Sequence, residues 1–288
     1  MTLSLLSDRG IDPALRAILL HASNAAKALE IAFFVGGAMA RDILLVHVFD
    51  QEVRRATRDV DLGIYIADWG QFQQLKTLLC ATGQFHCRAG ETHRLHFGAP
   101  VGIPLDLIPF GPIESPARSI AWPPDHHVVL NVAGFEDAFA SAVNVDLGDG
   151  LTIKTCSLPS LAVLKLLAWK DRRKITGKDA SDFLLIAQRY AEAGNMDRLF
   201  EHEPALLVAA KYDPDLAGAM LLGKDAALQS QPGTAVLVQE ILASDSLRQE
   251  LIDQIIRANA ATLTKGAEQN YQRLMDAFRA GFISRLLT

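Results

Sequence analysis

Hydrophobic and polar positions follow different patterns in the two halves of the chain. Up to about residue 155, short apolar runs of strand length alternate with helix-like stretches and turn residues. After residue 157 the strand pattern nearly disappears, and the apolar residues recur at helical spacing. We therefore expect an α+β fold in two domains. Residues 1–155 are expected to form a mixed sheet with flanking helices, and residues 156–288 an all-α domain.

Apolar runs bounded by turn residues predict six strands in the first domain. They lie at residues 32–35, 60–66, 94–97, 105–108, 128–132 and 151–154. Helices are expected at residues 38–49 and 69–81. Residues 110–124 contain four prolines, which favours an irregular crossing at the surface.

The second domain is expected to consist of helices. Ser157 is suited to cap the first of them, which has Pro159 in its first turn and ends near Arg172. The others are expected at residues 179–193, 195–202, 204–211, 216–224, 234–243, 246–263 and 267–286.

Composition narrows the class of protein. Of the 288 residues, 50% are hydrophobic and 21% are charged, which supports a sizeable core. No apolar run approaches the ~20 residues of a membrane span, so no transmembrane helix or secretory signal is expected. Three cysteines without a C-x-x-C pair indicate a reducing cytoplasm. With a net charge of −5, any contact with nucleic acid would need a local basic patch.

The first candidate for chemistry is the turn at Gly36 and Gly37, where an apolar strand gives way to a helix. Glycines allow backbone N–H groups to approach an anion, and a helix N-terminus adds positive potential, which suits a phosphate. A tight strand-to-helix turn requires glycine as well, so both interpretations stay open. The G-x-G-x-x-G fingerprint of dinucleotide-binding folds is absent.

The second candidate is the pair Asp59 and Asp61. On a strand, residues two apart project from the same face, while the apolar residues between them face a core. Two carboxylates that close repel each other unless a cation lies between them, which favours a hard metal ion. A second D-x-D, Asp213 to Asp215, lies in a helical region and is expected to cap a helix.

The third candidate is Asp106, a single carboxylate within an apolar strand. A buried, unpaired aspartate costs several kcal/mol, so this side chain needs a metal ion, a charged partner or hydrogen-bond donors. An edge-strand position with the side chain in solvent is the alternative interpretation.

Taken in chain order, these segments resemble the pattern of the nucleotidyltransferase superfamily that includes the DNA polymerase β-like enzymes. The sequences GGAMARDILL, TRDVDL and LDLIPFG, followed by SLPSLAVLKLLAWKDRR and KDASDFLLI, are similar to predicted bacterial nucleotidyltransferases related to the abortive-infection toxins. The resemblance covers residues 30–190. Gly37 and Asp59 are separated by more residues than is usual in the superfamily, so a longer helix or a loop is expected between them. That loop would contain Arg54, Arg55 and Arg58.

The resemblance implies a role for each candidate residue. Gly36 and Gly37 would hold the triphosphate, together with Arg41, Arg58 and Lys165. The three carboxylates of Asp59, Asp61 and Asp106 would be catalytic and would bind two Mg²⁺ or Mn²⁺ ions, which clamp an in-line displacement.

In the second half, Lys165, Trp169 and Arg172 recur at the spacing of one helical face. Such a face suits contact with phosphates, whereas long basic side chains at the edge of a core are the alternative. Lys165 matches a lysine of the resembling family, as do Lys178, Asp179 and Asp182. Asp179 is expected to cap the next helix, and Asp182 to pair with a base on the preceding one.

These observations predict a Mg²⁺-dependent nucleotidyltransferase that moves a nucleoside monophosphate from an NTP to a hydroxyl acceptor. The acceptor stays open between RNA (such as tRNA), protein and a small molecule, the last including modification of an antibiotic. An antitoxin protein is an expected partner. The rival interpretation is an inactive nucleotide-binding or toxin–antitoxin partner module.

Overall fold

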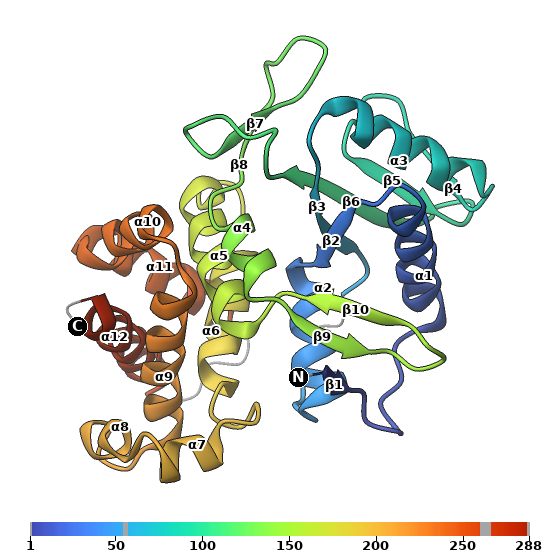
Figure 1. Cartoon of the computed structure of the whole chain (residues 1–288). Coiled ribbons are helices and arrows are strands. Elements are labelled where there is room, and N and C mark those ends of the chain that lie inside the picture. The colour runs from blue at the N-terminus through green and yellow to red at the C-terminus, as the bar shows by residue number, and fades with distance from the viewer. Residues whose placement is uncertain (1, 54–56, 260–265, 287–288) are drawn as a thin grey trace. The chain divides into compact units, whose positions relative to one another are not determined.

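The computed structural model describes residues 2–53, 57–259 and 266–286. These residues divide between two units, Met1–Ser157 and Leu158–Thr288. Figure 1 shows the first unit in blue to green and the second in yellow-green to red. The first unit is a mixed sheet with helices and the second is helical, which confirms the expected α+β class.

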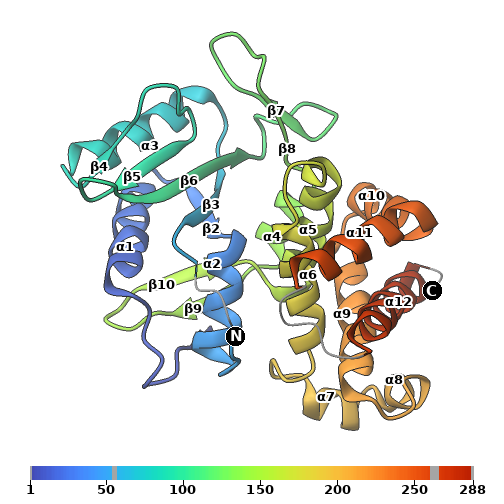
Figure 2. The same ribbon diagram turned by 180° about the vertical axis from the view of Figure 1, so that it is seen from behind.

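An eight-stranded mixed sheet forms the first unit. The order of its strands is β1-β9-β10-β2-β3-β6-β5-β4, with β4 at one edge (Figure 2) and β1 at the other (Figure 1). The strands are β1 (Thr2–Ser4), β2 (Ala32–Val35), β3 (Val60–Tyr65), β4 (Phe85–His86), β5 (Arg94–Phe97), β6 (Ile103–Phe110), β9 (Val143–Asp146) and β10 (Thr152–Thr155). Three pairs are parallel: β1 with β9, β10 with β2, and β3 with β6.

Five of the six expected strands lie in this sheet, with shifts of at most two residues at either end. The sixth, expected at residues 128–132, forms a separate two-stranded sheet instead: β8 (Val129–Asn131) pairs with β7 (Ser119–Ala121). The expectation that residues 110–124 are irregular throughout is therefore wrong, because β7 lies within them. Strands β1, β4 and β9 were not expected.

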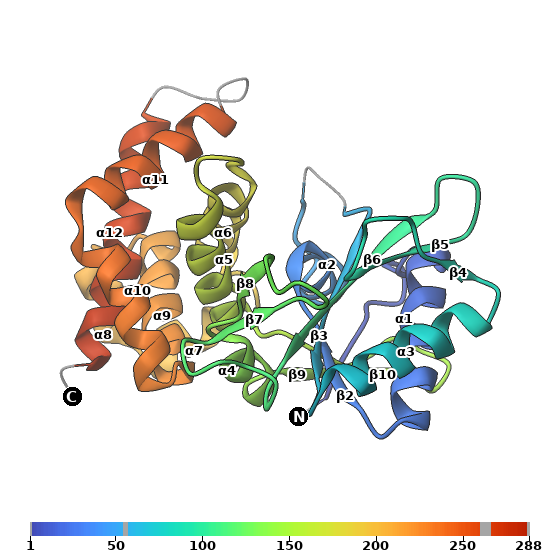
Figure 3. The same cartoon turned by 90° about the horizontal axis from the view of Figure 1, so that it is seen from above.

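Two helices of the first unit pack on the same face of the sheet. They are α1 (Pro13–Ala28) and α3 (Trp69–Ala81), which lie side by side in Figure 3. Asp12 caps α1 by accepting hydrogen bonds from the N–H groups of Ala14 and Leu15 at 2.8 and 3.2 Å. A side-chain cap at each helix start fixes where the chain leaves the preceding loop.

The segment expected to be helical at residues 38–49 consists of two parts. α2 (Gly37–Asp42) is α-helical and continues into η1 (Ile43–Val48), which is a π-helix. A short helix, α4 (Phe135–Ala140), was not expected. The long spacing between Gly37 and Asp59 is thus filled by a helix of 12 residues and a following loop, of which residues 54–56 lie outside the described residues.

The second unit contains eight described helices, among them the seven expected after the first. They are α5 (Leu158–Arg172), α6 (Lys178–Arg189), α7 (Met196–Glu201), α8 (Pro204–Ala209), α9 (Pro214–Gln229), α10 (Pro232–Ala243), α11 (Asp245–Ala258) and α12 (Ala267–Leu286). Asp213 caps α9, as expected, by accepting a hydrogen bond from the Leu216 N–H at 3.2 Å. The expected continuation of α11 to residue 263 falls partly on residues 260–263, outside the described part of the chain.

An ion pair with a buried carboxylate connects α9 to α7 and to the residue that follows α6. The Asp225 carboxylate accepts two hydrogen bonds from Arg198, at 2.6 and 2.7 Å, and one from the Tyr190 hydroxyl at 2.6 Å. Burial and the neighbouring carboxylate raise the pKa of Tyr190 well above its usual value, so the hydroxyl stays a donor. Within the described residues, no helix is both long and apolar enough to cross a bilayer.

Helices α9 and α12 approach each other closely enough for backbone to meet backbone. A Cβ atom added at Gly223 would lie 2.0 Å from the Phe278 carbonyl oxygen, and one at Gly281 would lie 1.8 Å from that of Met220. Only glycine allows this approach, because any side chain would separate the two helices.

We expect Gly223→Ala to lower the free energy of unfolding by about 1–3 kcal/mol, the usual cost of overpacking a core. Gly233→Ala is the matched control, since nothing lies within 4 Å of its added Cβ in the first turn of α10. That change should be neutral or stabilise the protein by up to about 1 kcal/mol. Urea unfolding of both variants is the measurement, and equal stabilities would contradict the close α9–α12 contact.

Candidate functional site

Two of the expected carboxylates lie side by side on adjacent strands. In the parallel pair β3·β6, Asp61 is directly opposite Asp106. Residues paired in this way project from the same face of a sheet. The neighbouring residues Val60, Leu62 and Ile64 are buried on the other face. The structure therefore brings Asp61 and Asp106 together, 45 residues apart in the chain.

The same face continues into an aromatic cluster beyond the carboxylates. Tyr65 stacks on Phe139 of α4, with ring centroids 5.8 Å apart and planes at 16°. Phe34 and Phe110 make edge contacts in the same cluster. Tyr65 is thus packed against protein rings along one side, and α4 covers this end of the face.

The Gly36–Gly37 turn lies against Asp61. Gly37 has a φ of +58°, and a Cβ added there would lie 1.8 Å from the Asp61 carboxylate oxygen Oδ2. The Gly36 N–H donates a hydrogen bond of 2.8 Å to the Asp61 backbone carbonyl. Glycine is required at position 37 by both its φ and this approach. The turn and the carboxylate pair therefore belong to one site.

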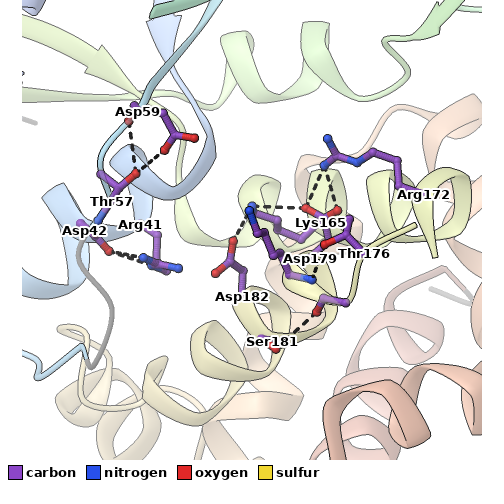
Figure 4. A network of polar contacts seen from close by, with 12 residues as sticks. Arg41, Asp42, Thr57, Asp59, Lys165, Arg172, Thr176, Asp179, Ser181 and Asp182 are labelled. Atoms are coloured by element: carbon purple, nitrogen blue, oxygen red, sulfur yellow. Dashed lines mark hydrogen bonds and ion pairs between the residues drawn. The ribbon is translucent and has the colours of Figure 1, made fainter. Parts of the chain in front are cut away.

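Asp59 lies one residue before β3 and is held by Thr57. The Thr57 hydroxyl donates to Asp59 Oδ1 at 2.6 Å, and the Thr57 N–H donates to Asp42 Oδ2 at 3.0 Å (Figure 4). Asp42, at the end of α2, is 5% exposed. These hydrogen bonds connect the C-terminal end of α2 to the segment that positions Asp59.

Arg41 takes a position that the sequence did not indicate. Its side chain is buried, and its guanidinium donates to Asp42 Oδ1, from Nε at 2.8 Å (Figure 4). A buried carboxylate needs such a partner, so Arg41 supports the framework of the site. Its expected contact with nucleotide stays a prediction. Arg58 is exposed, and Arg54 and Arg55 lie outside the described residues.

The residue that the sequence analysis missed is Arg94. It lies on β5 directly opposite Asp106, and its guanidinium forms a two-pronged ion pair with that carboxylate: Nε to Oδ1 at 2.6 Å and a terminal nitrogen to Oδ2 at 2.7 Å. The hydrogen bond with Asp106 raises the pKa of Arg94, and the charge of Asp59 adds to this. Strand 94–97 was expected, but its pairing with Asp106 depends on a register that the sequence does not reveal.

The carboxylate side chains of the site are its donors for a divalent metal ion. Asp59 and Asp61 offer the oxygen ligands that Mg²⁺ and Mn²⁺ prefer. Both oxygens of Asp106 accept hydrogen bonds from Arg94, and each keeps a second lone pair with which it can bind a metal ion. Within the described part of the chain, no group of three or more His, Cys, Asp and Glu side chains is arranged to hold a metal ion. The expected two-metal site at Asp59, Asp61 and Asp106 stays a prediction.

In the second unit, Lys165 of α5 lies among carboxylates of α6. Its Nζ is 2.5 Å from Asp182 Oδ2 and 3.4 Å from Asp179 Oδ1 (Figure 4). Arg172 binds both oxygens of Asp179, at 2.9 and 2.8 Å. The expected pairing of Asp182 with a base on the preceding helix is confirmed. Asp179 lies in the first turn of α6, and these ion pairs engage its side chain.

Trp169, between these two basic residues on α5, is fully buried. Its indole N–H donates to Gln254 Oε1 of α11 at 3.0 Å. The expected cationic face of Lys165, Trp169 and Arg172 is therefore wrong as a surface stripe, because its central residue belongs to the core.

Solved structures with some likeness to the chain are distant ones. A nucleotidyltransferase-like protein from Paracoccidioides brasiliensis is 19% identical over 72% of this chain and 94% of its own, with a TM-score of 0.40. ANT(2")-Ia, solved with adenylyl-2"-tobramycin, is 14% identical over 68% and 95%, with a TM-score of 0.37. The CCA-adding enzyme of Thermotoga maritima, solved with tRNA, is 11% identical over 97% and 83%, with a TM-score of 0.26.

No curated protein matches the chain. A protein family does: the one described as the nucleotidyl transferase AbiEii toxin of a type IV toxin–antitoxin system matches residues 18–281. The match includes the Gly36–Gly37 turn, the carboxylates on β3 and β6, and Lys165, and it extends across both units. The chain therefore belongs to the AbiEii family of nucleotidyltransferase toxins.

Proposed function

We propose that the protein transfers a nucleoside monophosphate from an NTP to a hydroxyl acceptor, with a divalent cation bound to Asp59 and Asp61. The observation that carries the proposal is the contact between Gly37 and the Asp61 carboxylate at the N-terminal end of α2. It sets a glycine turn, where backbone N–H groups can approach phosphate oxygens, beside a carboxylate that can bind the cation of a metal–nucleotide complex.

In this proposal each residue of the site has its own role. The Gly36–Gly37 turn binds phosphate oxygens, and Thr57 orients the Asp59 carboxylate through its hydroxyl. Asp59 and Asp61 hold Mg²⁺ or Mn²⁺. When bound, such an ion offsets charge on the phosphates and activates an oxygen nucleophile. Positioning and charge make up most of the protein's contribution to phosphoryl and nucleotidyl transfer.

The proposal extends to an acceptor and a partner protein. We propose that the acceptor is a cellular hydroxyl on RNA (such as tRNA), protein or a small molecule, and that a separate antitoxin protein opposes the activity. The type IV toxin–antitoxin description of the family supports the partner.

We expect wild-type protein to transfer labelled NMP to a cellular acceptor when Mg²⁺ is present. Asp61→Asn should lower the rate about 100-fold or more, because charge stabilisation worth several kcal/mol is removed. The measurement is incubation with each α-labelled NTP and total RNA, protein or small-molecule extract, with and without EDTA.

Asp215→Asn is the matched control for this change. It removes the second aspartate of the other D-x-D, in the first turn of α9, and should leave transfer unchanged. If the wild type binds nucleotide but transfers it to none of these acceptors, the proposed activity is wrong and the protein is a nucleotide-binding module.

Gly37→Ala should abolish nucleotide binding, since its Cβ would displace the Asp61 carboxylate or the start of α2. Gly83→Ala is the control, because Gly83 also has a positive φ, of +72°, but has nothing within 4 Å of the added Cβ. Both changes strain the backbone by about 1 kcal/mol. Thermal unfolding should report a loss in both variants, with a larger one in Gly37→Ala because of its added contact with Asp61, while calorimetry with Mg²⁺ and NTP should show lost nucleotide binding in Gly37→Ala alone. Equal nucleotide affinities would argue against this turn as the phosphate site.

Lys165→Ala should weaken nucleotide binding and also lower stability by about 3 kcal/mol, because it removes the ion pairs of Lys165 with Asp182 and Asp179. Adding Asp182→Asn should restore part of the stability but none of the affinity. Lys170→Ala, on the same helix, removes a surface ion pair with Glu240 and should change neither. Recovery of nucleotide affinity in the double variant would make the role of Lys165 purely structural.

A further inference from the structure

Two of the three cysteines lie next to each other in the first unit. Cys80 is in the last turn of α3, and Cys87 directly follows the edge strand β4. Their sulfur atoms are 3.8 Å apart, although seven positions separate them in the chain. The pair lies outside the candidate site, because β5 separates β4 from the strand that carries Asp106. Neither thiol takes part in the proposed function.

The chain reversal between the two cysteines is fixed by its own hydrogen bonds. The Thr82 hydroxyl donates to the Leu79 carbonyl at 2.7 Å and accepts from the Gln84 N–H at 3.2 Å. The Gly83 N–H donates to the Cys80 carbonyl at 3.0 Å, and Gly83 has a φ of +72°, which favours glycine. The fold therefore brings the two thiols together before any bond joins them.

The two thiols differ in their surroundings. Cys87 is exposed, so an oxidant in solution can reach its sulfur. Cys80 is half-buried, and burial together with the Cys87 thiol raises its pKa, although the Lys76 ammonium acts in the opposite direction. A thiol with a raised pKa is a poor first nucleophile, because the thiolate is the reactive form. An accessible cysteine beside a second cysteine is the arrangement typical of reversible oxidation.

We propose that Cys80 and Cys87 form a reversible oxidation site, at which a peroxide converts the two thiols into a disulfide within the chain. Cys87 reacts first with the peroxide, and Cys80 then closes the bond. The disulfide joins the C-terminal end of α3 to β4, an edge strand of two residues. The inference is independent of the nucleotidyl transfer proposed above, because it depends on the two thiols alone.

The reaction has two steps. The Cys87 thiolate attacks one oxygen of hydrogen peroxide, the O–O bond breaks, and a sulfenic acid and hydroxide form. The hydroxide becomes water with the proton that Cys87 released. The Cys80 sulfur then attacks the Cys87 sulfur, the S–O bond breaks, and the leaving hydroxide takes the Cys80 proton to form a second water. The two thiols thereby lose two electrons and two protons, and one peroxide is reduced to two waters.

The test is oxidation of the reduced full-length protein with hydrogen peroxide, followed by unfolding, alkylation with iodoacetamide and mass spectrometry. Both cysteines lie in one tryptic peptide, residues 77–88. In the wild type this peptide should become about 2 Da lighter and escape alkylation, because two hydrogens are lost. Cys156, which is buried in the folded protein, should stay open to alkylation after unfolding. Dithiothreitol should restore all three thiols.

Three variants test the order of the steps. Cys80→Ser should lose the Cys87 thiol at the wild-type rate and leave a sulfenic acid that dimedone traps, whereas the wild type should give no such adduct. Cys87→Ser should lose the Cys80 thiol about tenfold more slowly, because less of that thiol is ionised. Cys156→Ala is the matched control and should form the disulfide as the wild type does.

Loss of all three thiols at equal rates, a disulfide between two chains, or no oxidation of Cys87 would each overturn the inference. Equal rates of thiol loss in the two serine variants would overturn it as well. So would a lasting dimedone adduct on Cys87 in the wild type, since Cys80 would then not reach the oxidised sulfur.

Discussion

The parallel pairing of β3 with β6 is the constraint on which the site depends. It places Asp61 and Asp106 on strands that are neighbours in the sheet, about 4.8 Å apart, where two carboxylates repel each other. Two neighbouring features are tied to this placement of the carboxylates. Arg94 binds Asp106 from the next strand, and the start of α2 approaches Asp61 so closely that only glycine fits at position 37. A shift of one residue in the pairing would turn one carboxylate into the core.

The sequence predicted those parts of the fold that are encoded locally. Strands β2 and β5 have the bounds that their apolar runs indicate, and α3 begins where Asp68 can cap it. Strands β1 and β9 were missed, because runs of three or four residues become strands only through their pairing with neighbouring strands. The helix α1 carried a readable signal that was overlooked: Asp12 is followed by a proline in the first turn.

The residues of the candidate site were likewise predictable only where their signal is local in the sequence. Chemistry and order in the chain identified the glycine turn and the three aspartates, and the structure places Asp61, Asp106 and Gly37 together. Arg94 could not be identified, because its role comes from the register of β5 on β6 and not from its neighbours in sequence. The helical spacing also grouped Trp169 with two basic residues. Spacing shows which residues share one face of a helix, but not whether another helix covers that face. Gln254, from a helix far along the chain, covers that tryptophan.

The glycine contact between α9 and α12 has a consequence for the order in which the two units fold. Every strand of the eight-stranded sheet lies within residues 2–155, so the first unit has all its pairing partners while the second is still being synthesised. The face of α9 around Gly223 stays uncovered until residues 267–286 have left the ribosome. The sheet is thus free to fold during translation, whereas the helical unit closes only afterwards.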